Sequence, residues 1–255
     1  MNTYKFMYTE NQCLYGKTSN EEAILRSVEC LHLSDQKWVN IKDMKLARSF
    51  CSAVVLEDQL YVLGGDTSNY LRWEPYLRSS NSMECYDPKK KSWKMMKTTM
   101  NTGRSNFASA VLNKKVYVMG GMSFSEKDNK KVVESSVERF DPLVQMYNRF
   151  NEPVFERMAP MKNARCDFTA SVLDGHLYVV GGQFDNKPVT SIERYNEETN
   201  TWQEIRGLEV SRHCHAAAVM FETSVTGTSA RDKSVKKVQQ PPKLGKKKGG
   251  GENLS

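Results

Sequence analysis

Short apolar runs recur along most of this chain, and polar segments separate them. Residues 53–56 and 60–63, for example, are apolar and flank a predicted three-residue turn. Val, Ile, Tyr and Phe fill such runs, as is typical of β-strands. No segment keeps an apolar period near 3.6 residues, so the pattern predicts almost no helix.

These runs belong to a block that occurs three times. The copies read ARSFCSAVVLEDQLYVLGG, GRSNFASAVLNKKVYVMGG and ARCDFTASVLDGHLYVVGG, and a variable loop follows each one. After the loop come SMECYDPKKKSW, SVERFDPLVQMY and SIERYNEETNTW. The Gly pairs start at residues 64, 120 and 181, which gives a period of 56 and then 61 residues. A period of this size is typical of stacked or circular repeats.

Partial copies flank the three full ones. Upstream, SVECLHLSDQKW places Glu29 and Trp38 at the same spacing of nine, after a degraded first part. Downstream, SRHCHAAAVMFE opens a new copy at Arg212, but Thr228 and Ser229 stand where its Gly pair is due. The chain is therefore expected to hold three full units and a partial unit at each end.

Each unit reads as four short antiparallel strands, which is one blade of a β-propeller. Asp174-Gly175 is a strong hairpin signal, because type I′ turns require positive φ. The Gly pairs fit a close approach between backbones, since Gly lacks Cβ. The predicted fold class is all-β, an incomplete propeller.

The units resemble kelch repeats on the motif Leu-Tyr-Val-x-Gly-Gly, then Ser-x-Glu-x-Tyr-Asp-Pro, then Trp. The first full copy holds all of these in order, and the resemblance covers roughly residues 27–220. Two departures are visible: Tyr147 stands where Trp is expected, with an apparent insertion at 148–156 after it, and Asn196-Glu197 replaces Asp-Pro. The resemblance implies a propeller with four-stranded blades. The expected organisation is a degraded blade at 1–26, a partial blade at 27–46, full repeats at 47–102, 103–163 and 164–210, a partial repeat at 211–222 and a tail at 223–255.

Charge is concentrated in this tail. The chain has 37 Lys and Arg against 30 Asp and Glu, and residues 223–255 carry eight basic and two acidic side chains. The tail lacks aromatic residues and contains Pro-Pro and Gly-Gly-Gly, so it is expected to be disordered. One hypothesis is that Lys246, Lys247 and Lys248 act in nuclear import or attract nucleic acid. The alternative is a solvated tail without such a role. Base-specific nucleic-acid binding is not expected.

The remaining composition favours a reduced, cytoplasmic protein without cofactors. The N-terminus lacks the apolar core of a signal peptide, and no apolar run reaches transmembrane length, so no membrane partner is expected. The six cysteines show no CxxC pairing. His213 and His215 alternate on a strand, but no third metal ligand accompanies them. No catalytic motif is present, so we expect no enzyme activity.

Four arginines are candidate partner-binding residues because each opens a first strand: Arg48, Arg104, Arg165 and Arg212. Around one channel mouth they would form a cationic site, and guanidinium groups suit carboxylates, so an acidic peptide segment is the natural ligand. In kelch-type adaptors, as the resemblance implies, arginines at this position contact acidic peptides. The alternative is that each Arg binds backbone carbonyls of the fold.

A second candidate surface is the loop at residues 66–80. It contains Tyr70, Arg72, Trp73 and Tyr76, and exposed aromatic and Arg side chains often dominate binding energy. The alternative for Trp73 is packing under its own loop.

The expected function is a protein–protein interaction module. The chain resembles the kelch part of BTB–BACK–kelch adaptors of cullin-RING ubiquitin ligases, and the printed sequence shows no BTB or BACK motif, so it is expected to hold a substrate without recruiting a ligase. The alternative is a cytoskeletal, actin-associated or scaffold kelch protein. Three full blades would leave open faces, which favour self-association.

Overall fold

The computed structural model describes residues 4–5, 25–32, 35–67, 79–125, 127–144, 146–148, 150 and 153–214. These residues form strands, turns and connections, and none of them is helical. They all belong to the first of two units, residues 1–219. The second unit, residues 220–255, lies outside the described residues, and the predicted basic tail lies there with it.

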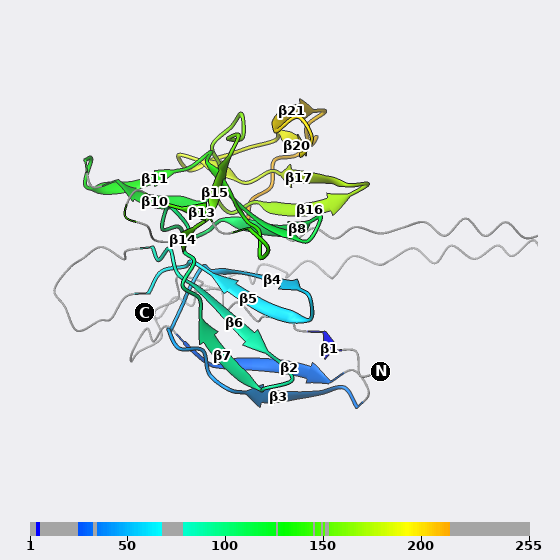
Figure 1. Cartoon of the computed structure of the whole chain (residues 1–255). Helices are drawn as coiled ribbons and strands as arrows, with labels where there is room; N and C mark the ends of the chain where they lie inside the picture. Colours follow the sequence, from blue (N-terminus) through cyan, green and yellow to red (C-terminus); the bar gives the residue numbers. More distant parts are fainter. Residues whose placement is uncertain are drawn as a thin grey trace, which may run out of the picture. The chain divides into compact units, whose positions relative to one another are not determined.

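Three antiparallel sheets of four strands form the body of the first unit (Figure 1). Blade 1 contains β4 (Ser52–Leu56), β5 (Gln59–Leu63), β6 (Met83–Asp87) and β7 (Ser92–Met95). Blade 2 contains β8 (Ala108–Leu112), β9 (Lys115–Met119), β12 (Val137–Phe140) and β15 (Glu156–Met158). Blade 3 contains β16 (Thr169–Leu173), β17 (His176–Val180), β20 (Ile192–Asn196) and β21 (Thr201–Ile205). The prediction of four antiparallel strands per repeat is confirmed.

Shorter strands complete the described part. A three-stranded sheet joins β1 (Tyr4–Lys5), β2 (Val28–His32) and β3 (Lys37–Ile41). Two hairpins follow the second and third Gly pairs: β10 (Met122–Ser125) with β11 (Lys130–Val133), and β18 (Gln183–Phe184) with β19 (Lys187–Pro188). A third hairpin, β13 (Met146–Tyr147) with β14 (Pro153–Val154), precedes the last strand of blade 2.

The turn between the first two strands of each blade has two residues. The prediction of three in the first copy is wrong, because β5 already begins at Gln59 and only Glu57 and Asp58 lie between the strands. Both have positive φ, 50° and 60°, as a type I′ turn requires. Asn113-Lys114 and Asp174-Gly175 repeat this geometry.

The Gly pairs sit where one blade meets the backbone of the next. Gly64 has φ of 58°, and a Cβ there would lie 2.7 Å from the carbonyl oxygen of Arg104. The amide of Gly65 donates a hydrogen bond of 2.9 Å to that same oxygen. Only residues without Cβ allow this approach, so the packing interpretation of the Gly pairs holds.

Apolar side chains fill the spaces between neighbouring blades rather than one central core. One cluster joins blades 1 and 2, and includes Tyr61 and Leu63 of β5 together with Val116 and Val118 of β9. A second joins blades 2 and 3, and a third joins β2 to blade 1. Each blade therefore depends on its neighbours for burial, as repeat proteins do.

The outer strand of blade 2 departs from the expected repeat. In blades 1 and 3 a Trp packs on the Tyr across from it, with ring centroids 5.1 Å and 5.0 Å apart. In blade 2 this place belongs to Phe155, which is 2% exposed and stacks on Phe140 at 5.4 Å. Tyr147 is 53% exposed. The extra residues therefore precede the core aromatic, Phe155, and Tyr147 lies among them. Phe155 follows Glu138 by seventeen residues, where the other copies have nine.

The second departure, Asn196-Glu197, connects blades 2 and 3. The Glu197 carboxylate accepts hydrogen bonds from Lys115 Nζ at 2.9 Å and Tyr117 Oη at 2.8 Å, and Asn113 also donates to it. Burial acts to raise the pKa of Glu197, but these donors prevail and hold it below its ordinary value. Replacement of Pro by Glu thus provides a polar contact between two repeats.

Candidate functional site

Three of the four predicted partner-binding arginines lie inside the fold. Arg48, Arg104 and Arg165 are 3%, 0% and 0% exposed. A guanidinium group without solvent contact cannot meet a partner on the surface. The prediction that these three arginines bind a partner is therefore corrected, because the fold itself uses all of their charge.

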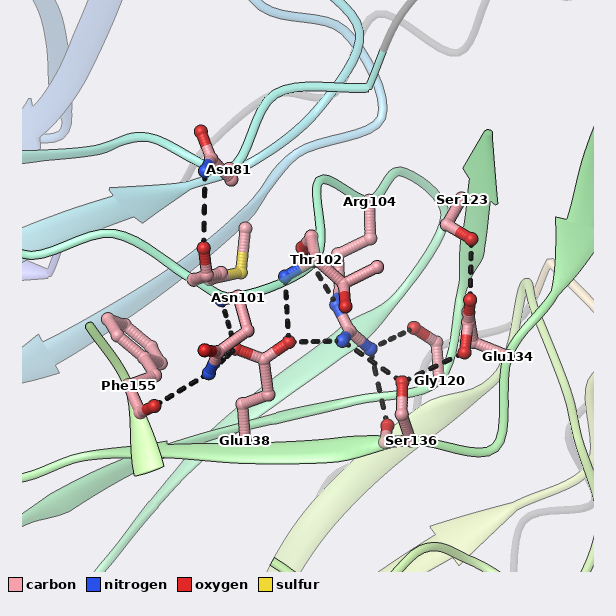
Figure 2. Close-up of polar contacts among 11 residues, drawn as sticks. Asn81, Asn101, Thr102, Arg104, Gly120, Ser123, Glu134, Ser136, Glu138 and Phe155 are labelled. Carbon is pink, nitrogen blue, oxygen red and sulfur yellow. Dashed lines mark hydrogen bonds and ion pairs between the residues drawn. The ribbon is translucent and has the colours of Figure 1, made fainter. Parts of the chain in front are cut away.

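Arg104 of blade 2 shows how the fold satisfies the charge of a buried arginine (Figure 2). Arg104 Nη2 lies 2.6 Å from Oε1 of Glu138, and Nη1 donates to the carbonyl oxygen of Gly120 at 2.8 Å. Further bonds go to the backbone and the hydroxyl of Ser136. The side chain thus joins the start of β8, the end of β9 and the start of β12 within one blade.

The carboxylate completes the connection. Glu138 accepts hydrogen bonds from the backbone amides of Asn101 and Thr102, at 2.5 and 3.1 Å. These residues lie on the segment that leads from blade 1 into blade 2. The pair therefore fixes the path between two blades, and because both charges are buried, removal of either one would be costly.

Blades 1 and 3 repeat this arrangement. Arg48 pairs with Glu84 at 3.2 Å, and Arg165 pairs with Glu193 at 2.7 Å. Burial lowers the pKa of Arg165, and the Glu193 charge opposes that shift. The sequence carried the signal for these partners, because every full copy places a Ser-x-Glu motif after the Gly pair.

Arg212 differs from the other three. It is exposed, while its carbonyl oxygen accepts a hydrogen bond of 2.8 Å from the amide of Gly182, as the equivalent oxygens do in earlier repeats. The printed sequence has no Ser-x-Glu motif after it. Arg212 is the predicted arginine whose side chain is accessible within the described residues.

The predicted aromatic loop lies almost wholly in a part of the chain that the structure does not describe. Tyr70, Arg72, Trp73 and Tyr76 lie in residues 68–78, outside the described residues. The two ends of this loop are described, and Asp66 forms a bridge with Ser79 there.

A buried carboxylate holds these loop ends. Asp66 is 1% exposed, accepts a hydrogen bond of 2.8 Å from Ser79 Oγ, and pairs with Lys131 Nζ at 2.8 Å. Lys131 belongs to β11, so the second repeat contacts the described end of this loop at Asp66. The repeat pattern did not predict this pair. In the other two full repeats the position of Asp66 is occupied by Met122 and Gln183, so no acidic residue recurs there.

A backbone chain links the repeats at this same end. The amide of Asn106 donates to the carbonyl of Phe50, that of Asp167 to Asn106, and that of Cys214 to Asp167. All four residues have φ between 50° and 54°. The side-chain amide of Asn106 also donates to the Asp167 carboxylate at 2.7 Å. These hydrogen bonds therefore join neighbouring repeats in the same way at the Gly-pair end.

Two kinds of feature are absent from the described residues. No three His, Cys, Asp or Glu side chains gather there in a way that could hold a metal ion. The same residues include no helix long and apolar enough to cross a membrane.

Comparison with known families gives a match over most of the chain. The model of the KLHDC2/KLHL20/DRC7 Kelch-repeats domain matches residues 9–228. Kelch-like protein 36 from Rattus norvegicus is 28% identical over 163 residues, which is 64% of this chain and 24% of that protein. Alpha-scruin from Limulus polyphemus is 26% identical over 204 residues, which is 77% of this chain and 20% of that protein. The chain spans about a quarter of the length of the curated relatives it matches.

A solved structure agrees on the fold. The structure of YjhT superposes with a TM-score of 0.59 at 16% identity, and covers 74% of this chain and 61% of that one. The three blades, the buried Arg–Glu pairs and the Gly pairs all lie within residues 9–228, which the family model matches. This chain belongs to the kelch-repeat family.

Proposed function

We propose that this protein binds a partner through the Gly-pair end of its blades. Kelch repeats mediate protein–protein interaction, and here the loops and hairpins that follow the Gly pairs are supported by backbone and side-chain bonds between repeats. The single observation that carries the proposal is the exposure of Arg212 beside Gly182, at the end where the other arginines are buried.

The exposed charge at this end favours an acidic peptide segment. Lys127 and Lys130 are exposed on the β10–β11 hairpin, and Lys187 is exposed on the β18–β19 hairpin. Phe184, which is 44% exposed, adds an apolar contact. Asp128 and Asp185 reduce the positive charge only in part. Complementary charge of this kind speeds association and selects the partner.

We further propose that the partner is a substrate of a ubiquitin ligase. The support is the set of relatives named Kelch-like protein and the human Kelch repeat and BTB domain-containing protein 12, which is 28% identical over 174 residues. In this proposal the kelch surface holds the substrate, and a BTB-containing form recruits the ligase. A scaffold role without ligase is the alternative, and ubiquitin transfer that depends on a BTB-containing form separates the two.

Charge reversal tests the binding surface. Arg212→Glu combined with Lys187→Glu is expected to weaken binding of a labelled Glu-rich peptide by about tenfold or more, because two favourable charge contacts become repulsive. Fluorescence anisotropy with the full chain measures this, and a peptide with Gln in place of Glu serves as the uncharged probe.

Arg157→Glu is the matched control, because Arg157 is exposed on the outer strand β15. It should change the affinity by less than about twofold. Equal affinities of the Glu-rich and Gln-rich peptides, or equal losses in both charge-reversal variants, would remove the proposed site.

We also propose self-association through an open blade face, on the basis of which side chains are exposed there. In blade 2, Tyr117 and Met119 are fully buried against blade 3. Their counterparts Tyr178 and Val180 in blade 3 are only half-buried. At the other end of the described repeats Trp38 is 41% exposed, whereas Trp93 and Trp202 are buried. The two faces are complementary halves of the interface that recurs between blades.

A further inference from the structure

The segment that leads into each blade makes the same contacts with that blade. We call it the entry segment; it covers residues 42–48, 98–104 and 159–165 for blades 1, 2 and 3. In blade 2, two amides of the entry segment donate to the Glu138 carboxylate, and Arg104 pairs with it (Figure 2). In blades 1 and 3 the core indole also donates to a carbonyl oxygen of the entry segment: Trp93 to Lys42 at 2.6 Å, and Trp202 to Ala159 at 2.9 Å.

Residues 206–212, after blade 3, have the form of a fourth entry segment. The amide of Leu208 bonds back to the blade that it leaves, at 2.8 Å, as the amide of Met161 does at 2.9 Å. Arg212 follows Leu208 by four residues, which is the spacing at all three blades. The segment is therefore arranged to receive another blade.

The contact groups of this fourth entry segment are uncovered. Alignment on Leu208 places the amides of Glu209 and Val210 where a carboxylate is bound, and the carbonyl oxygen of Arg206 where an indole donates. Glu209, Arg206 and Arg212 are exposed, and Val210 is 65% exposed. What this segment lacks is a Glu and a Trp in the positions that a following blade supplies.

The β1–β2–β3 sheet has the missing half of the arrangement. Glu29 and Trp38 occupy the positions of the Glu and the Trp in the full blades. Trp38 is 41% exposed, whereas Trp93 and Trp202 are 4% and 6% exposed. Glu29 is exposed, whereas Glu84 is fully buried. This sheet therefore offers a carboxylate and an indole to an entry segment.

Apolar side chains of the two halves match as well. Leu112 and Val137 of blade 2 are 2% and 1% exposed, because blade 3 covers them. Their equivalents on blade 3, Leu173 and Ile192, are half-buried, and so is Leu31 on β2. Joining the two halves would remove these apolar groups from water, as happens between neighbouring blades.

The charges of the two halves are opposite in sign. The half at blade 3 has more basic than acidic side chains: Arg194, Arg206 and Arg212 against Glu209. The half at the first sheet has more acidic than basic ones: Glu29 and Asp35 against Lys37, besides the internal pair of Arg26 with Asp43. Opposite charge favours association of one half with the other.

We propose that two copies of this chain join head to tail, with residues 206–212 of each copy seated on the β2–β3 sheet of the other. Arg212 of one copy pairs with Glu29 of the second, and the indole of Trp38 donates to the carbonyl oxygen of Arg206. The amides of Glu209 and Val210 donate to the same Glu29 carboxylate. This inference rests on the self-association proposed above and assigns its contacts.

A second copy is the partner because each half supplies what the other half lacks, and a single chain leaves both halves uncovered. When two copies close on each other both contacts form, and neither blade face stays open. Each copy brings the β1–β2–β3 sheet and three four-stranded blades. Two copies thus supply about eight blades, at the upper end of the roughly four to eight in propellers.

Charge exchange between copies tests this proposal. Sedimentation of the full chain should show a dimer, and Glu29→Lys should weaken it by at least about thirtyfold, because like charges would meet in a desolvated contact. Arg212→Glu should have the same effect. An equimolar mixture of the two variants should restore the dimer to within about fivefold of the wild-type affinity, since every contact again joins a positive and a negative side chain.

Asp58→Lys is the matched control, because it makes the same change of charge at an exposed turn of blade 1, where the equivalent residue of blade 2 is Lys114. It should change the dimer affinity by less than about twofold. All three variants should melt near the monomeric wild-type temperature, since the replaced side chains are exposed.

Peptide binding provides a separate readout. Glu29→Lys keeps Arg212, so it should still bind the Glu-rich peptide, whereas Arg212→Glu should lose both the dimer and the peptide. A wild-type chain that stays monomeric at about 0.1 mM would remove self-association itself. A dimer that is insensitive to Glu29→Lys, a mixture that does not restore it, or an assembly larger than a dimer would overturn the head-to-tail contact alone.

Discussion

Replacement of Glu138 by Ala is expected to lower the free energy of unfolding by about 3–5 kcal/mol. The reason is that Arg104, which is 0% exposed, would keep a buried charge without its carboxylate, and the amides of Asn101 and Thr102 would lose their acceptor. Chemical denaturation followed by circular dichroism measures the change.

Glu156→Gln is the control for this experiment. Glu156 also pairs with an arginine of blade 2, Arg139, but its side chain is 36% exposed. Ion pairs with this exposure contribute about 1 kcal/mol or less. Similar effects of Glu138→Ala and Glu156→Gln would contradict the structural role of the buried pair.

Replacement of Phe155 by Ala is expected to cost about 3–5 kcal/mol of stability, because it removes a buried ring from the outer strand of blade 2. The ring is 2% exposed and stacks on Phe140. Thermal unfolding of the full chain provides the measurement.

Tyr147→Ala is the matched comparison, since Tyr147 occupies the place that the repeat pattern assigns to the core aromatic. It is 53% exposed, so its loss should cost less than about 0.5 kcal/mol. The opposite order, with Tyr147→Ala the more harmful change, would show that the blade closes on Tyr147 instead.

The repeat pattern predicted the blades because the same constraint acts in every copy. Gly64 and Gly120 each let the backbone of the next blade approach closely, which only Gly allows. Gly181 recurs at the same repeat position with the same positive φ. The strand order follows from the short turns that join neighbouring strands. Local chemistry also determined the type I′ turn at Asp174-Gly175, although Glu57-Asp58 adopts positive φ without any Gly.

The role of the arginines was harder to predict. A repeated Arg at the start of a strand is consistent with a cationic binding site at the channel mouth and also with a buried Arg–Glu ion pair. Only the position of the Ser-x-Glu motif in the folded structure distinguishes these two roles. Once Glu138 is placed beside Arg104, burial leaves no charge for a partner. Arg212 also opens a repeat, but the printed sequence has no Ser-x-Glu motif after it, and its side chain is exposed. The role of such an arginine therefore depends on whether the fold places a carboxylate beside it.

The insertion shows a different limit of pattern reasoning. Alignment by spacing assigned Tyr147 to the core, because it follows Glu138 by nine residues as Trp93 follows Glu84. The structure instead selects Phe155, whose strand β15 pairs with β12 after the detour. Phe and Tyr are both aromatic residues that fill blade cores, so only pairing in three dimensions decides between them.

Amide hydrogen exchange of the full chain tests the central claim most directly, namely that three kelch blades held by buried Arg–Glu pairs form one folded support. The account predicts the slowest exchange in β5, β9 and β17, the second strands of the blades, and fast exchange at the exposed Leu143, Val144 and Phe150. Uniformly fast exchange across residues 47–205 would contradict it, because no set of buried pairs would then be holding the blades together.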